Sequence, residues 1–255
     1  TIKAGPGLRV WRSSFGSVHL DYVNPSTAAG TGVFEEGWVT PENLVWWYTI
    51  APAVRWPEDL ERLEQPRFDM NKLKDIKKRV KELHEQGYFV VTSHHSPFDS
   101  GWRYLRGVKQ WLIDLVRDPA FAKRLIKFAI EPQIEATEII LDEAGVDGVW
   151  SSGDQGTPEG PFLSPRLYKE LIYPWDERLC HSYHKRGAFV FTHSHGYILP
   201  IINEMIKAGF DVINPVSPLC RMNLAEIKEK YGDKLTFYTE LTTEQATREL
   251  ESGGK

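Results

Sequence analysis

Two histidines separated by one residue, His193 and His195, are the side chains of this sequence best suited to chemistry. They follow the apolar, β-rich run 188–192 and precede a segment with helical periodicity, 198–208. Residues at i and i+2 of an extended chain point to the same side, so both imidazoles can converge. Two convergent imidazoles suit a metal ion that polarises an oxygen or activates a thiol. The structural alternative is that both rings hydrogen-bond to loop carbonyls.

A metal site needs a third protein ligand, and several residues that follow predicted strands are candidates for it. They are Glu240, Asp154, His94 and His95. We take Glu240 as the expected third ligand, beside the two histidines of the 193–195 loop. Cys220 could be a further ligand or a buried thiol, and burial is typical of a free cysteine.

Asp154 lies in a glycine-flanked loop, Gly153 to Gly156, directly after a predicted strand at 146–151. A carboxylate there can orient a substrate, accept a proton or hydrogen-bond to a metal-binding histidine. The alternative is a turn residue bonded to its own backbone. We expect Asp154 to be catalytic, and we expect Trp150, near the end of the same strand, to contact the substrate.

A second polar cluster, His94, His95 and Asp99, follows the predicted strand 88–92. Adjacent residues of an extended chain point to opposite sides, so at most one of the two histidines faces the site. We assign a catalytic role to His94 and substrate binding to His95 and Asp99. Arg103 is typical of a helix surface, but an arginine at this edge could hold a substrate carboxylate, and we include it among the substrate-binding residues.

The polar loops all follow strands of a chain in which strands and helices alternate. Its centre is one βαβ unit, with strand 188–192, helix 198–208 ended by Gly209, and strand 210–214. Other strands are predicted at 88–92, 146–151 and 234–238. Helices are predicted at 69–86, 102–116, 119–144 with a kink at Pro132, 165–185 with a bend near Pro174, and 224–230. In parallel α/β folds the loops at the carboxyl ends of the strands carry the chemistry.

This alternation predicts a parallel sheet, either a TIM-type (β/α)8 barrel or a doubly wound sheet. No GxGxxG or GxxxxGK[ST] motif supports nucleotide binding, and we favour the barrel. Only about five regular strands are predicted, so the barrel is expected to be incomplete in this chain unless residues 1–50 contribute. Those residues are β-like but broken by glycines, which indicates a hairpin or excursion. We expect one domain over 1–255, with an irregular β-rich excursion at 1–50 and regular β/α units at 51–255.

Composition narrows the classes of partner. The 31 Lys and Arg residues nearly balance 35 Asp and Glu residues, which argues against a nucleic-acid partner. Two cysteines make a disulfide framework improbable and favour a reducing compartment. No apolar run approaches the ~20 residues that span a bilayer, and residues 1–30 lack the features of a signal peptide. We therefore expect a cytoplasmic protein that acts on a small molecule without a membrane partner.

Four segments taken together resemble the uroporphyrinogen decarboxylase superfamily in order and spacing. They are GVDGVWSSGDQG at 145–156, FLSPRLYKELIYPW at 162–175, KRGAFVFTHSHGYILPIINEMIKAGFDVINPV at 185–216 and YGDKLTFYTELTTEQ at 231–245. The resemblance covers most of the chain, from about Phe34 to Gln245. It implies a TIM-type barrel, in agreement with the periodicity.

The superfamily includes methyltransferases that pass a methyl group between a small substrate or coenzyme thiol and a corrinoid (cobalamin) protein. Members of this branch bind zinc through a His-x-Cys pair in the loop that matches THSHG, together with a later Cys. His193 matches the histidine of that pair, and His195 stands where its Cys would be. Because histidine also ligates zinc, the resemblance implies a zinc-dependent enzyme with a corrinoid protein as its partner.

Metal-free decarboxylation of uroporphyrinogen or a related polycarboxylate, as in tetrapyrrole biosynthesis, is the alternative function within the superfamily. That branch uses neither metal nor cofactor, and its Ser-His-Ala-Gly stretch is replaced here by SGDQG at 152–156. The GDQG form is more similar to divergent, methyltransferase-like members. A third hypothesis is a non-catalytic binding barrel that has kept the fold and lost the chemistry.

Overall fold

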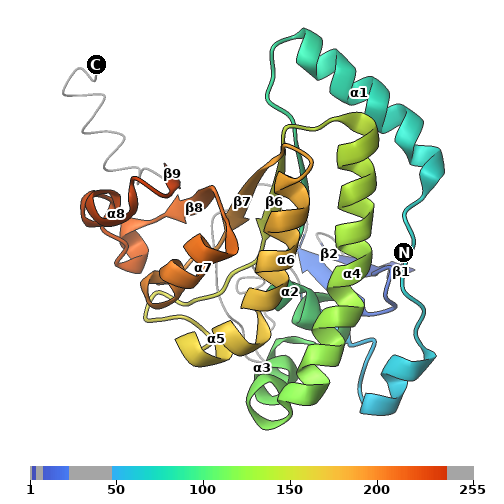
Figure 1. Ribbon diagram of the computed structural model, residues 1–255. Coiled ribbons are helices and arrows are strands. Elements are labelled where there is room, and N and C mark those ends of the chain that lie inside the picture. Colours follow the sequence, from blue (N-terminus) through green and yellow to red (C-terminus); the bar gives the residue numbers. More distant parts are fainter. Residues whose placement is uncertain (1, 4–7, 23–47, 240–255) are drawn as a thin grey trace.

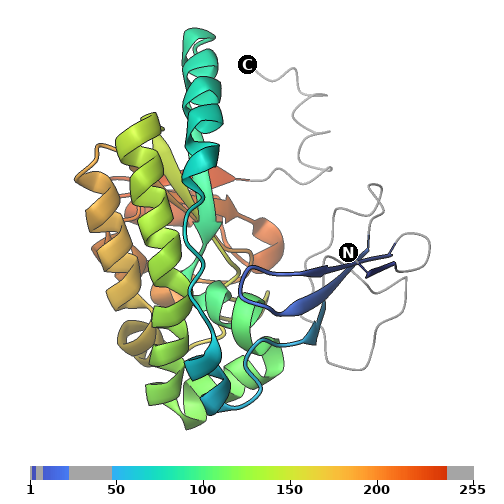
Figure 2. The ribbon, with the colours of Figure 1, turned by 90° about the vertical axis from the view of Figure 1, so that its right-hand side faces the viewer.

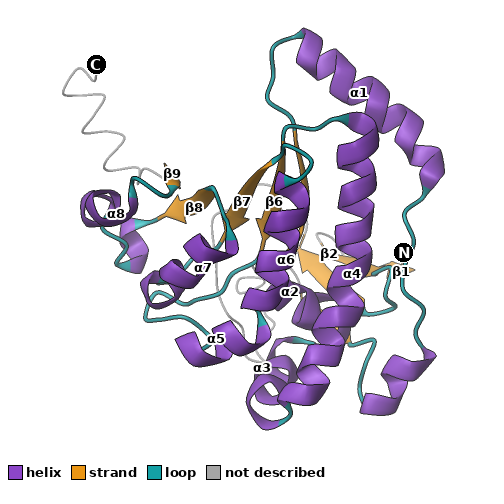
Figure 3. Ribbon diagram, viewed as in Figure 1, coloured by secondary structure: helices purple, strands orange, loops and turns teal. Residues whose placement is uncertain are grey.

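Two β-sheets with their helices make up the structure, a computed structural model that describes residues 2–3, 8–22 and 48–239 (Figures 1 and 3). The first sheet is antiparallel and joins β1 (Ile2–Lys3), β2 (Leu8–Arg12), β3 (Val18–Tyr22) and β4 (Tyr48–Ala51) in that order. Phe15, in the turn between β2 and β3, is buried and stacks on Tyr104 with ring centroids 5.0 Å apart. Within the described residues, the strands of this sheet pair with no strand of the second sheet.

The second sheet consists of five parallel strands that follow one another in sequence order. They are β5 (Val91–His95), β6 (Gly148–Ser152), β7 (Phe189–His193), β8 (Val212–Val216) and β9 (Thr236–Thr239). Because each connection leads to the adjacent strand, right-handed crossovers place the intervening helices on one face. Figures 1 and 2 show α4 and α6 along that face. This is the winding of a (β/α) barrel, of which the described strands form an open segment.

The helices begin and end close to where capping residues predict. The α-helices are α1 (Leu73–Glu85), α2 (Pro97–Ser100), α3 (Val108–Arg117), α4 (Pro119–Ala144), α5 (Pro165–Leu171), α6 (Tyr173–His184), α7 (Ile202–Ala208) and α8 (Leu224–Tyr231). A π-helix spans Gly101–Arg106, and short 3-10 helices span Pro57–Arg62, Met70–Lys72, Leu199–Ile201 and Pro218–Cys220. None of the helices in the described ranges has both the length and the apolar character needed to cross a bilayer.

Two of the expected helices are divided. The segment expected to be helical from 102 starts as the π-helix and breaks at Gly107, whose φ of 77° is outside the helical range. The helix expected over 165–185 separates into α5 and α6 at Ile172, because Pro174 cannot donate a backbone hydrogen bond to the preceding turn. By contrast, α4 runs for 26 residues through Pro132, from its Asp118 cap to Gly145 in the left-handed conformation.

The two faces of the parallel sheet differ in burial. Val149, Val190 and Ile213 point toward the helices and are fully buried, and burial of such a side chain stabilises the fold by about 1.5–3 kcal/mol. The opposite face carries Phe189 and Tyr238, which are 55% and 57% exposed. The core therefore lies between the sheet and the helices. On the other face Phe189 and Tyr238 are accessible, whereas Val212 and Asn214 of β8 are buried.

One contact occurs twice at the amino ends of the parallel strands. His84, in the last turn of α1, lies 2.9 Å from Asp147, and His184, in the last turn of α6, lies 2.9 Å from Asp211. Each aspartate also accepts a backbone N–H from the neighbouring strand segment, at 2.6 and 2.7 Å. The two contacts tie β5 to β6 and β7 to β8, and so help to set the alignment of the strands at their carboxyl ends.

Candidate functional site at the carboxyl ends of the strands

Four neighbouring strands bring polar side chains into one row at their carboxyl ends. The register pairs His95 of β5 with Ser152 of β6, Ser152 with His193 of β7, and His193 with Asn214 of β8. Paired residues of adjacent parallel strands project to the same face, and side chains alternate along each strand. The row therefore lies on the face of Phe189, which the helices leave open.

The orientation of His193 is set by Asn214. His193 Nδ1 lies 2.7 Å from the side-chain oxygen of Asn214, and the Asn214 amide nitrogen donates to the carbonyl oxygen of Tyr238 at 3.4 Å. Because a carbonyl oxygen only accepts hydrogen bonds, Nδ1 carries the proton and Nε2 of the neutral ring keeps its lone pair. This Nε2 lies 3.9 Å from Asp154 Oδ1.

His195 and Asp154 complete a group of three around His193. The rings of the two histidines are nearly perpendicular, with centroids 4.9 Å apart. Asp154 Oδ1 accepts the backbone N–H of His195 at 2.8 Å. The structure thus brings together three residues that the sequence places on two separate loops.

The environment of Asp154 suits proton transfer. Burial raises the pKa of this carboxyl, and the backbone N–H of His195 and the two nearby imidazoles offset the increase only in part, so the pKa stays above its ordinary value. The side chain is still 41% exposed, which leaves it accessible to a substrate. A carboxyl group with a raised pKa exchanges its proton closer to neutrality, as general acid–base catalysis requires.

Close backbone packing holds the two loops together. Gly196 has a φ of 106°, and a Cβ at this position would lie 2.4 Å from the carbonyl carbon of Gly156. Ser194 Oγ also accepts the backbone N–H of Gln155 at 2.9 Å. The glycines of the GDQG and THSHG segments are therefore needed for the approach that places Asp154 beside the histidines.

At the β5 end of the row, Asp99 holds two candidate substrate-binding side chains. His95 Nδ1 lies 2.8 Å from the Asp99 carboxylate, and the guanidinium of Arg103 forms an ion pair with the same group. Burial acts to raise the pKa of Asp99, but the charge of Arg103 and the contact with His95 outweigh it, so the pKa is lowered. Asp99 is only 1% exposed, so it positions His95 and Arg103. This burial does not fit the substrate-binding role that the sequence analysis assigns to Asp99.

His94 lies on the opposite face of the sheet. It is buried, its Nδ1 is 2.8 Å from the carbonyl oxygen of His95, and its Nε2 is 2.9 Å from the hydroxyl of Tyr183 on α6. Burial lowers its pKa to about 4, so the ring is neutral at pH 7. This placement does not fit the catalytic role expected for His94, because consecutive strand residues point to opposite faces and the helix layer covers this one.

Trp150 forms an aromatic surface next to the row. It stacks on Phe191, its register partner, at 5.5 Å and an interplanar angle of 9°, and its ring lies 6.2 Å from that of His193. Tyr238 contacts it edge-on at 6.0 Å. A flat apolar surface beside convergent polar groups is typical of small-molecule sites.

Sequence reasoning missed Asn214 and Tyr238. Both lie at the ends of strands that were predicted, 210–214 and 234–238, so position at a strand end was the available signal. That signal does not distinguish a residue that orients a histidine from one that faces the core, because the contact depends on the register between strands.

Imidazole nitrogens such as those of His193 and His195 are donors that zinc accepts in proteins, but two of them do not make a metal site. In the part of the chain that the structure describes, no three His, Cys, Asp or Glu side chains form a group that could hold a metal ion. Glu240, the expected third ligand, lies outside the described residues. Cys220 is buried, as expected. His193 nevertheless has the arrangement of zinc-bound histidines, with one ring nitrogen held by a carbonyl oxygen and the other available.

Comparisons with known proteins agree with this architecture. The profile of the family described as uroporphyrinogen decarboxylase (URO-D) matches residues 48–238. Among solved structures, the chain is similar to a methyltransferase from Methanosarcina mazei, with a TM-score of 0.60 and 17% sequence identity. The alignment covers 76% of this chain and 56% of that chain, so this chain spans little more than half the length of that neighbour. At such identity the likeness shows a shared fold. No curated protein matches the sequence.

Proposed function

The chain belongs to the uroporphyrinogen decarboxylase family, and we propose that it is a zinc-dependent methyltransferase that moves a methyl group between a small substrate and a corrinoid protein. The observation that carries this proposal is the tautomer of His193, whose Nδ1 is held by Asn214 while Nε2 is available beside His195 and Asp154. The methyltransferase that shares the fold supports the same class of reaction.

We assign the zinc to His193 and His195, with Glu240 as the third protein ligand. Zinc held there would act as a Lewis acid on the oxygen or sulfur whose bond to the methyl group is made or broken. Three protein ligands would leave a coordination position for that atom, which is the arrangement of catalytic zinc sites in general.

Asp154 is the residue that we expect to handle the proton. When a thiol takes a methyl group from a methylated corrinoid, a sulfur–carbon bond forms, the cobalt–carbon bond breaks, and the bonding electron pair remains on cobalt. The thiol proton must leave in the same process, and Asp154 is an exposed carboxyl beside the histidines with a raised pKa. His95 and Arg103, both held by Asp99, would orient the polar part of the substrate, and Trp150 would contact its apolar part.

The described residues give less support to the alternative, metal-free decarboxylation of a polycarboxylate such as uroporphyrinogen. Binding several carboxylates calls for several convergent cationic side chains. In the described part of this end of the sheet, Arg103 pairs with Asp99, and Arg221 donates to the carbonyl oxygens of Pro158 and Glu159. These arginines already have partners within the protein.

The test combines zinc content with turnover. Protein prepared with zinc available is expected to hold one zinc per chain and to convert methylcobalamin to cob(I)alamin in the presence of a thiol, followed by absorbance. His193→Ala and His195→Ala should lose both properties, and Glu240→Gln should weaken zinc binding.

The matched control is His181→Ala, which removes the same side chain from an exposed position on α6. It should keep both zinc and turnover. A protein that neither holds zinc nor demethylates methylcobalamin would show that the proposal is wrong, and would leave decarboxylation or a non-catalytic barrel.

A further inference from the structure

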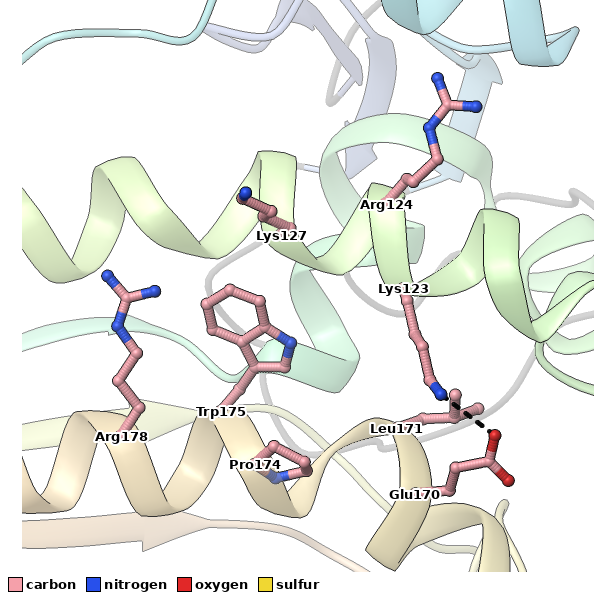
Figure 4. A pocket seen from close by; sticks show the side chains of 8 residues that line it. All are labelled: Lys123, Arg124, Lys127, Glu170, Leu171, Pro174, Trp175 and Arg178. Atoms are coloured by element: carbon pink, nitrogen blue, oxygen red, sulfur yellow. Dashed lines mark hydrogen bonds and ion pairs between the residues drawn. The ribbon is translucent and has the colours of Figure 1, made fainter.

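A second candidate site lies in the helix layer, on the side of the sheet away from the row of polar residues. It is a groove of about 490 Å³ between α4 and the junction of α5 with α6 (Figure 4). Four cations line it, together with one tryptophan and one acid: Lys123, Arg124, Lys127, Arg178, Trp175 and Glu170. Three of these cations form ion pairs, Lys123 with Glu170, Arg124 with Glu61 and Arg178 with Glu131, so within the described residues the positive excess at the groove comes from Lys127.

Ion pairs mark the two ends of the groove. At one end Lys123 lies 3.1 Å from Glu170, and at the other Arg178 lies 3.2 Å from Glu131 (Figure 4 shows the first of these). The cationic side chains of both pairs are half exposed, at 50% and 51%, and exposed pairs contribute only about 0–1 kcal/mol. An incoming anion can therefore displace or share these partners with little loss of stability.

Between the two pairs lie Lys127 and Trp175. Lys127 is exposed, and within the described residues its ammonium group makes no ion pair or hydrogen bond. Trp175 comes from α6, on the other side of the groove, and the guanidinium of Arg178 lies 5.2 Å from the centre of its ring. The middle of the groove thus offers a positive charge without a partner and a flat aromatic side chain.

We propose that this groove binds a small organic anion with at least two negative charges and a flat ring, the chemistry of a nucleoside diphosphate. The anionic part would lie among Lys127, Lys123 and Arg178, whose nitrogens can donate charge-assisted hydrogen bonds. The ring would lie against the indole of Trp175. The volume is in the range of small-molecule sites, roughly 300–1,000 Å³, and the pairs at both ends favour a compact ligand over an acidic polypeptide.

Calorimetric titration with ADP, adenosine and inorganic diphosphate tests the proposal. ADP should bind roughly tenfold or more tightly than either fragment, because only ADP combines the charge with the ring. Lys127→Glu should weaken ADP binding by a similar factor, and added salt should weaken binding to the unmodified protein. Lys109→Glu makes the same change at an exposed lysine of α3 and should leave ADP binding unaltered.

Trp175→Leu is the second variant. It keeps an apolar side chain but removes the flat ring, so ADP should then bind no better than inorganic diphosphate; circular dichroism checks that each variant is folded. If the unmodified protein binds ADP and diphosphate with equal affinity, the proposed ring contact is wrong. If Lys127→Glu binds ADP as tightly as the unmodified protein does, the proposed site is wrong. Binding of polyglutamate that depends on Lys127 and that ADP does not displace would instead assign the groove to an acidic polypeptide.

Discussion

The Nδ1 of His193 lies 2.7 Å from the side-chain oxygen of Asn214, and this contact joins β7 to β8 at the ends that carry the candidate site. Asn214 is itself held by its hydrogen bond to the carbonyl oxygen of Tyr238. The tautomer of His193, and with it the available nitrogen, is therefore decided by a residue from a different strand.

Asn214→Ala should weaken the zinc site without removing a ligand. Loss of the group that orients a metal-binding histidine typically reduces metal affinity or activity by roughly 10–100-fold. Asn214→Asp, which can accept the same hydrogen bond, should retain most of the affinity. Zinc affinity is measured by competition with a chromophoric chelator, with Asn71→Ala, at an exposed position in the 3-10 helix before α1, as the control. Unchanged affinity in Asn214→Ala would contradict the orienting role.

His94 should make the protein sensitive to acid. Its pKa in the folded state, about 4, lies below the ordinary 6.5, so between these values the unfolded state binds a proton that the folded state does not. The difference should reduce the free energy of unfolding by about 3 kcal/mol as the pH falls from 7 to 4. Urea unfolding at several pH values checks this, and His94→Gln should show a smaller decrease. Parallel curves for the two proteins would exclude His94 as the cause.

Asp176 should have the opposite effect. It is fully buried, one oxygen accepts from the hydroxyl of Tyr168 at 2.6 Å, and the other has no hydrogen-bond partner among the described residues. Burial raises the pKa of Asp176 to about 7, above its ordinary value of 3.8. Between these pH values the folded state holds a proton that the unfolded state releases, so the free energy of unfolding decreases as the pH rises from 3.8 to 7. The free energy of unfolding of Asp176→Asn, measured with urea relative to that of the unmodified protein, should therefore increase by up to about 4 kcal/mol between pH 4 and 8. A stability difference that does not vary with pH would contradict a neutral Asp176.

Gly196→Ala should distort the loop that carries His195. The added Cβ would lie 2.4 Å from the backbone of Gly156, and φ at this position is 106°. Overpacking of this kind costs about 1–3 kcal/mol, and His195 should move away from Asp154. Gly160→Ala is the matched control, because a Cβ there has no neighbour within 4 Å. The measurement compares the unfolding free energies and zinc contents of the two variants. Equal values would show that the loops of Gly196 and Gly156 accommodate the added methyl group.

The sequence by itself determined the local order of the elements. The run that became β7, the stop of α7 at Gly209 and the cap of α4 at Asp118 depend on residues close to one another in the chain. Strand and helix alternation also implied that Asp154 and His193 leave parallel strands at the same end, and they do. The breaks inside helices were harder to predict from the sequence, because no sequence pattern comparable to a capping residue indicates the π-helix before Gly107.

Tertiary structure decided which side chains meet. Alternation along β5 required His94 and His95 to point to opposite faces, but it did not say which face the helices cover. That was settled by the packing of α6, where Tyr183, 89 residues further along the chain, binds His94. In the same way, the register of β7 with β8 selected Asn214 as the partner of His193. A pattern confined to neighbouring residues carries no information about such contacts, because their formation depends on how distant segments pack.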